Sequence, residues 1–213
     1  MGKIGTFIES DGFGNTLHYI WKSLKSQFTH TSHTYCLFAD RGDTVLSRRG
    51  GYYAEYQIIT KVEQLEIVHF GRLKLCPWRK WLDEGSYVVV LFKDNEPIAF
   101  GWTHFKSHSV DAVGTFDLGE EKAWLGPQFV HHKHRGHGLQ KELITLSVSN
   151  APESIKSFIT SVNVRNTASL HSCKKCGFQK GLEVSYTAGM FAKKKTEIRV
   201  LNSSANNYFK LTQ

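Results

Sequence analysis

The chain lacks the long apolar segments of membrane-spanning proteins and the many cysteines of disulfide-rich ones. Its longest apolar run, residues 87–92, is far shorter than the roughly 20 residues that cross a bilayer, so we expect no membrane span. The N-terminal residues contain no apolar core typical of a signal peptide. With only 4 cysteines among 213 residues, the simplest interpretation is a cytoplasmic protein with reduced thiols.

Acidic residues are also scarce. The 19 Asp and Glu residues face 27 Lys and Arg residues, which gives a formal net charge of +8. This balance favours anionic partners such as phosphorylated cofactors, nucleic acids or membrane surfaces, although many small basic proteins bind no polyanion. There is no internal repeat, and the 40% hydrophobic content suffices for a core, so disorder is expected only at the ends.

The hydrophobic pattern predicts a mixed fold. Strands are predicted at residues 35–39, 44–46, 57–60, 87–92, 98–105, 124–130, 157–164, 182–186 and 196–201. Helices are predicted at residues 14–28, 62–70, 77–85, 138–149 and 166–175, and the polar stretch 107–121 is expected to be a loop. This order predicts an α/β (α+β) domain with a central, mostly antiparallel sheet of about seven strands and helices on both faces.

We divide the chain into three parts. Residues 1–56 are predicted to be an N-terminal extension, a helix plus short strands, that packs on the main domain or extends it. The main domain is expected over residues 57–201, where the pattern is most regular. Residues 202–213 form a polar C-terminal tail that we expect to be frayed, although its aromatic side chains could dock.

The most informative segment is residues 124–140. An apolar run that predicts a strand enters a basic turn broken by Gly136 and Gly138, and a helical pattern follows. Glycines let a backbone approach an anion closely, and the first free N–H groups of a helix point at it. Arg135 adds a fixed positive charge beside this turn. The segment therefore predicts a phosphate-binding site.

A second motif lies about thirty residues downstream. Asn166 caps a predicted helix that closes with the pair Gly177 and Phe178. Together with the sequence Arg-Gly-His-Gly-Leu-Gln at residues 135–140, this motif resembles the GNAT superfamily of N-acetyltransferases, whose signature turn reads Gln/Arg-x-x-Gly-x-Gly/Ala. The resemblance covers roughly residues 57–201.

The resemblance implies a GNAT fold and acetyl-CoA as cofactor. The backbone of the turn would bind the diphosphate of CoA, and the end of the preceding strand would pair with the pantetheine amides where the sheet splays. The cofactor-binding residues expected on this basis are Phe129, Val130, Arg135, Gly136, His137, Gly138, Leu139, Gln140 and Asn166.

The resemblance also implies the reaction. An amine would attack the acetyl carbon directly, without a covalent enzyme intermediate, so we expect an enzyme, an acetyl-CoA-dependent N-acetyltransferase. The acceptor would be a primary amine on a small molecule, an amino sugar, or a protein or peptide. No nucleic-acid partner is expected, and the sequence leaves the oligomeric state open, with a homodimer as one option. Tyr52, Tyr53, Trp102 and His104 are candidates for the acceptor pocket, although aromatic residues more often belong to the core.

Two positions depart from the family pattern. Gln140 stands where the turn usually has Gly or Ala, and it would crowd the phosphates. Cys173 stands where many members have a tyrosine that protonates the leaving thiolate, so Cys173, Tyr186 and His171 are candidates for the acid. For the general base we select Glu121, just before the strand that ends in the turn. The nearby residues Glu120, Asp117 and His104 are the alternatives.

Two other functions are weighed against this one. The histidines of residues 131–137 and the C-x-x-C of Cys173 and Cys176 could form a zinc site. The cysteines fall inside a predicted helix, and no second C-x-x-C exists, so no metal is expected. A basic nucleic-acid-binding module is the other alternative. The basic residues are spread along the chain, however, and most aromatic residues follow core patterns.

Overall fold

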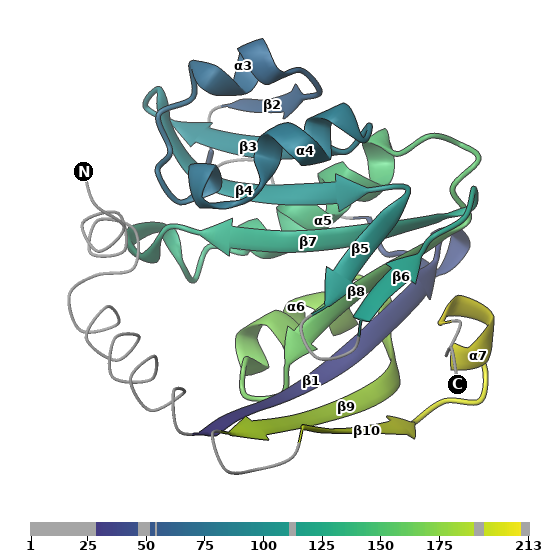
Figure 1. Ribbon diagram of the computed structural model, residues 1–213. Coiled ribbons are helices and arrows are strands. Elements are labelled where there is room, and N and C mark those ends of the chain that lie inside the picture. Colours follow the sequence, from purple (N-terminus) through teal and green to yellow (C-terminus); the bar gives the residue numbers. More distant parts are fainter. Residues whose placement is uncertain (1–28, 47–51, 54, 111–113, 190–193, 210–213) are drawn as a thin grey trace.

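The computed structural model describes residues 29–46, 52–53, 55–110, 114–189 and 194–209 (Figure 1). Its main sheet has eight strands within these residues, in the order β10-β9-β1-β8-β7-β4-β3-β2. They are β1 (Thr29–Asp40), β2 (Glu55–Ile59), β3 (Tyr87–Lys93), β4 (Glu96–His104), β7 (Lys122–Val130), β8 (Ser157–Asn163), β9 (Gln179–Gly189) and β10 (Lys195–Val200). Only β7 and β8 pair in parallel; the other neighbours are antiparallel.

The remaining elements are a small hairpin and short helices. The hairpin pairs β5 (Ser107–Val110) with β6 (Gly114–Asp117). The α-helices are α3 (Val62–Glu66), α4 (Trp78–Asp83), α5 (Leu139–Asn150), α6 (Thr167–Lys175) and α7 (Ala205–Tyr208). Single 3-10 turns are η1 (Arg41–Asp43), η2 (Leu73–Leu75) and η3 (His132–His134). In the part of the chain described, no helix is long and apolar enough to cross a membrane.

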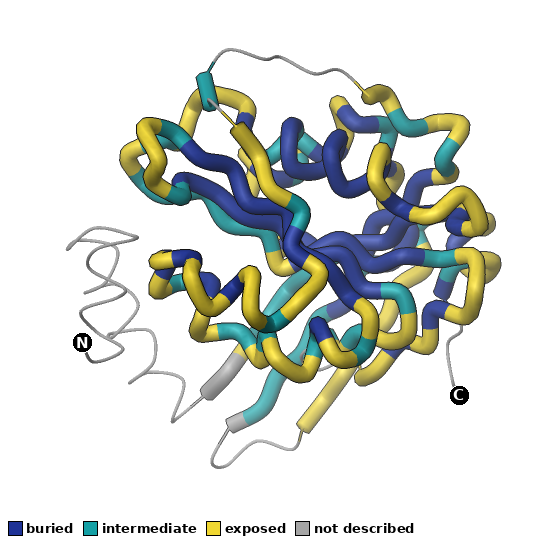
Figure 2. Tube along the Cα trace, turned by 90° about the horizontal axis from the view of Figure 1, so that it is seen from above, coloured by how far each residue is buried: buried dark blue, intermediate teal, exposed yellow. Residues whose placement is uncertain are grey.

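Helices cover both faces of the sheet, as predicted. Apolar residues of α5 and α6 pack on one face, with Leu143 and Cys173 among those fully enclosed. The opposite face is covered by α3, α4, the β5–β6 hairpin and the C-terminal segment that ends in Phe209. Seen from above, the buried positions concentrate in the middle of the molecule, along the sheet and the helices beside it (Figure 2). The predicted fold class, a mostly antiparallel central sheet between helices, is confirmed.

Three local predictions are wrong. Residues 44–46 form no strand, because the chain turns through η1, where the Arg41 guanidinium donates to the carbonyl groups of Ala151, Pro152 and Ile155. The stretch 107–121 is not a simple loop. It contains the β5–β6 hairpin, whose Phe116 packs on the core. The helix predicted over residues 62–70 already ends at residue 66. The helix predicted over residues 14–28 lies outside the described residues.

The two end segments join the fold more closely than the sequence indicated. β1 lies inside the main sheet, hydrogen-bonded to β8 on one side and to β9 on the other. Residues 29–40 therefore form part of the central sheet itself. In the C-terminal segment Phe209 is 1% exposed, and Tyr208 stacks on Phe38 at 4.1 Å between ring centroids. The limits of the three predicted parts of the chain stay a prediction.

The sheet splits between β7 and β8. These strands pair only at Lys122–Ser157, Ala123–Phe158 and Trp124–Ile159, although both continue further. Beyond this point β7 follows β4 alone, with a register shift opposite Gly126 and Pro127. Gly126 has a φ of 134°, a conformation that glycine adopts most readily. Beyond Trp124 the two parallel strands diverge, and the ladder between β7 and β8 does not continue.

Candidate functional site

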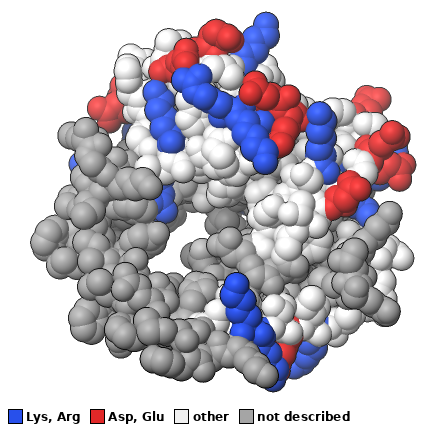
Figure 3. All heavy atoms as spheres, viewed as in Figure 1, with Lys and Arg blue, Asp and Glu red and all other residues white. Residues whose placement is uncertain are grey.

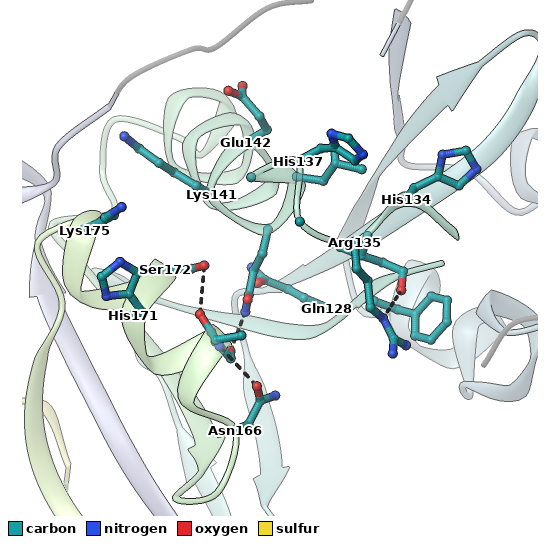
Figure 4. A pocket seen from close by; sticks show the side chains of 18 of the residues that line it. Gln128, His134, Arg135, His137, Lys141, Glu142, Asn166, His171, Ser172 and Lys175 are labelled. Carbon is teal, nitrogen blue, oxygen red and sulfur yellow. Dashed lines mark hydrogen bonds between the residues drawn. The ribbon is translucent and has the colours of Figure 1, made fainter. Parts of the chain in front are cut away.

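A pocket of about 930 Å³ lies where the end of β7, the glycine turn, α5 and α6 meet (Figure 4). Its wall is formed by Arg72, Gln128, Phe129, Val130, His134, Arg135, Gly136, His137, Gly138, Leu139, Gln140, Lys141, Glu142, Asn166, Ala168, Ser169, His171, Ser172 and Lys175. All of the residues predicted to bind the cofactor are among them. The two sequence motifs, separated by some thirty residues of chain, therefore form one site.

The glycine turn has an open backbone. Gly136 and Gly138 have φ angles of 87° and 76°, in the left-handed region that residues with a side chain adopt at a cost. A Cβ atom at either position would meet no described atom within 4 Å. These positions need glycine because of their backbone conformation, and the space beside them is free for a ligand.

The turn also offers unused hydrogen-bond donors. No described residue accepts a hydrogen bond from the backbone N–H groups of residues 136–140. The next N–H groups, those of Lys141 and Glu142, already donate to the Gly138 carbonyl. The unused groups stand at the start of α5, where the helix dipole adds positive potential. This arrangement can bind a phosphate group.

Two arginines flank the strand that leads into the turn. The Arg135 Nε donates to the Val130 carbonyl at 3.1 Å, which ties the turn back to the end of β7. The guanidinium groups of Arg72 and Arg135 lie 5.4 Å and 6.0 Å from the centre of the Phe129 ring. Sequence reasoning missed Arg72. No local pattern marks it, because it reaches the pocket only through the packing of Phe70 against Phe129.

Gln140 does not block the turn in the way expected from its size. Its side-chain amide donates to the Ser169 hydroxyl on α6 (Figure 4). Ser169 in turn donates its backbone N–H to the Asn166 Oδ1 at 3.1 Å, so the predicted cap at Asn166 is confirmed. The Gln140 side chain therefore bridges α5 to α6, and the bond fixes the relative position of the two motifs.

The opposite rim of the turn is held by Tyr52. Its ring stacks on His137, with centroids 3.7 Å apart and planes at 11°, and its hydroxyl lies 2.9 Å from the His134 Nδ1. The ammonium group of Lys93, on β3, lies 4.0 Å from the centre of the Tyr52 ring. Burial and the positive charge of Lys93 lower the pKa of His134, which favours its neutral form. Tyr52, suggested above for an acceptor pocket, thus supports the glycine turn.

The predicted catalytic residues do not meet at this pocket. Glu121 is exposed in the turn just before β7, roughly 30 Å of extended chain from Val130, and does not line the pocket. Tyr186 lies on β9, paired with Ser32 and Thr196, and it too is outside the wall.

Cys173 also points away from the pocket. It is 2% exposed and packs in the core beneath α6, and burial raises the pKa of its thiol to about 12. The wall positions on α6 include Ala168, Ser172 and Lys175, which share one helical face, whereas Cys173 and Leu170 share the other. Of the candidates for the acid, His171 alone lines the pocket.

A buried histidine stands at the point where the sheet splits. The His104 Nε2 lies 2.9 Å from the Gly126 carbonyl oxygen, and its Nδ1 lies 2.9 Å from the Ser86 hydroxyl. A carbonyl only accepts, so Nε2 carries the proton and Nδ1 accepts from Ser86. Burial lowers the pKa of His104 to about 4, which favours this neutral form. With both nitrogens engaged, His104 anchors the backbone at the split.

Two observations bear on the alternative functions. Among the residues described, no group of three or more His, Cys, Asp and Glu side chains is arranged to hold a metal ion. On the face drawn in Figure 3, the described lysine and arginine side chains near α3 and α4 lie interspersed with acidic ones.

The fold is shared with solved acetyltransferase structures. A GCN5-related N-acetyltransferase from Kribbella flavida matches with a TM-score of 0.51 and 12% identity, over 83% of this chain and 64% of that one. A GNAT-family acetyltransferase from Colwellia psychrerythraea matches with a TM-score of 0.50 and 16% identity, over 78% and 60%. A tandem GNAT protein from the clavulanic acid biosynthesis pathway matches with a TM-score of 0.54 and 14% identity, over 83% of this chain and 59% of that one.

At these identities the likeness shows the fold alone, and the chain spans about three fifths of the length of the matched structures. No curated protein matches the chain. The model of the acetyltransferase (GNAT) family matches residues 52–178, which is more than half of the chain and includes both motifs of the pocket. The chain therefore belongs to the acetyltransferase (GNAT) family.

Proposed function

We propose that the protein is an acetyl-CoA-dependent N-acetyltransferase that transfers an acetyl group directly to a primary amine. Family membership supports acetyl transfer in general. The observation that carries the proposal is the turn at residues 136–140, whose N–H groups have no described acceptor and whose glycines face open space.

The site fits coenzyme A in three respects. Its diphosphate needs several hydrogen-bond donors and positive charge, and the turn, the start of α5 and Arg135 provide them. Its pantetheine arm needs a narrow path with backbone partners, and the edge of β7 beyond Trp124 has no ladder partner on β8. The pocket volume of about 930 Å³ lies within the usual range for cofactor sites.

When bound, acetyl-CoA supplies a thioester whose carbonyl carbon an amine can attack. The chain's own residues would position the acetyl-CoA. The turn would hold the phosphates, and the edge of β7 beyond Trp124 would guide the arm toward the split. His104 fixes the Gly126 carbonyl there through a 2.9 Å hydrogen bond. A thioester held in one place would lower the entropic part of the barrier to attack. We do not assign the proton transfers to Glu121, Cys173 or Tyr186, because none of them lines the pocket.

The acceptor is proposed as a primary amine on a small molecule, an amino sugar or a peptide. All cysteines are free thiols, which supports the proposal that the protein acts in the reducing cytoplasm.

A thioester-cleavage screen tests the proposal. Purified protein is incubated with acetyl-CoA and separate panels of peptide N-termini, lysine peptides, polyamines, amino sugars and aminoglycosides, and free CoA is detected with a thiol reagent. We expect amine-dependent release of CoA with at least one panel and a matching mass increase of the amine. Failure to bind CoA in calorimetry, together with no turnover in any panel, would refute the proposal.

A further inference from the structure

Beside the turn, the pocket has a second group of basic side chains. Lys141 on α5 and His171 and Lys175 on α6 line the pocket. In Figure 4 these side chains gather on one side of the pocket, and Arg135 lies on the other. The bond from Gln140 to Ser169 holds α5 and α6 together beneath them. The pocket can therefore accept negative charge at two places.

The charges of this group are available to a ligand. Among the described residues, Lys141, His171 and Lys175 form no ion pair and donate no side-chain hydrogen bond. The one carboxylate in the pocket wall is Glu142, which is 2% exposed and accepts from the Tyr53 hydroxyl at 3.5 Å. Two lysines against one buried carboxylate leave the wall positive. An ammonium group is a compact charge suited to a terminal phosphate.

From this arrangement we propose that Lys141 and Lys175, with His171, form a subsite for a phosphate monoester. The inference rests on the proposed function, since CoA carries such a group on its ribose in addition to the diphosphate. The turn would hold the diphosphate while Lys141, His171 and Lys175 bind the monoester. The protein would then select free CoA over a donor that lacks the 3′-phosphate.

Two ligands and one neighbouring lysine test the subsite. Calorimetry measures Kd for CoA and for 3′-dephospho-CoA with the wild type, with the double variant Lys141→Gln and Lys175→Gln, and with Lys174→Gln. Lys174 is the matched control because it is exposed on the same turn of α6 but does not line the pocket. Thermal melting checks that each variant folds.

We expect the wild type to bind CoA about tenfold or more tightly than 3′-dephospho-CoA, since each charge-assisted contact contributes roughly three- to tenfold. The double variant should lose this preference by weakening for CoA alone, and Lys174→Gln should keep it. Equal wild-type affinity for the two ligands would overturn the subsite and leave the proposed function intact. Equal weakening for both ligands in the double variant would overturn it as well. If neither ligand bound, the proposed function and the subsite would fail together.

Discussion

The substitution Gly138→Ala separates folding from ligand binding at the phosphate turn. Gly138 has a φ of 76° and open space around its Cβ position, so the new methyl group clashes with nothing in the described protein. The free energy of unfolding therefore falls only by the cost of placing alanine in the left-handed conformation, about 1–2 kcal/mol. In a protein of this length that cost lowers Tm by about 2–8 °C.

Ligand binding should suffer more than folding. Relaxation of the strained backbone, or the methyl group itself, removes at least one N–H contact to a charged phosphate, at a cost of about 1.5–3 kcal/mol. This corresponds to about a 10- to 100-fold rise in Kd for CoA. Isothermal titration calorimetry measures the Kd, and differential scanning calorimetry measures the Tm.

Gly119→Ala is the matched control. Gly119 also has a left-handed φ, 62°, with nothing within 4 Å of its Cβ position, but it lies in the turn before β7 and outside the pocket. In this variant the Tm should fall by a similar amount, and the Kd for CoA should stay within about twofold of the wild-type value. If Gly138→Ala lowered the Tm but bound CoA as tightly as Gly119→Ala does, the turn would not be the phosphate site.

Three further predictions follow from buried or stacked side chains. Tyr52→Ala should raise the Kd for CoA about fivefold, an effect of roughly 1 kcal/mol, because the turn loses its stack on His137. Tyr52→Phe keeps the stack and should stay near wild type. Cys173→Ala should lower the free energy of unfolding in urea by about 1 kcal/mol through a small cavity. It should leave the alkaline limb of the pH–rate profile in place, and loss of that limb would restore Cys173 as the acid. The pKa of His104 falls to about 4 in the folded protein, so the unfolded chain binds more protons between pH 6.5 and 4. The share of stability lost through His104 as the pH drops through this range should be about 3 kcal/mol. His104→Gln should make the dependence shallower without removing it, because burial also lowers the pKa of the neighbouring His108, to about 3. An equally steep dependence in the variant would show that other groups cause it.

The elements predicted best are those encoded in short local patterns. The glycine turn before α5 and the cap at Asn166 depend on residues within a few positions of one another, and both stand where the sequence placed them. The pocket that joins them also depends on the contact between α5 and α6 at Gln140 and Ser169.

What the sequence did not show depends on contacts between distant segments. The place of β1 between β8 and β9 is decided by pairing across more than a hundred residues. The β5–β6 hairpin is too polar for its alternation to stand out, and it is held by Phe116 against Trp124. Arg72 and Tyr52 reach the pocket from outside both motifs.

The burial of Cys173 has a simple cause. The family pattern assigns that position by counting from Asn166, and the count is correct. The side chain, however, lies on the helical face shared with Leu170, which packs in the core. A small buried thiol in place of a long tyrosine does not extend to the pocket, so the position alone did not determine the role.

The central claim is that the backbone of residues 136–140 binds the phosphates of CoA. Titration of CoA into 15N-labelled protein tests it directly, because each amide of the turn reports separately. We expect the amide signals of Gly136, His137 and Gly138 to shift most, in step with saturation, as their N–H groups acquire acceptors. Saturable binding that leaves these signals unmoved and shifts amides elsewhere would contradict it.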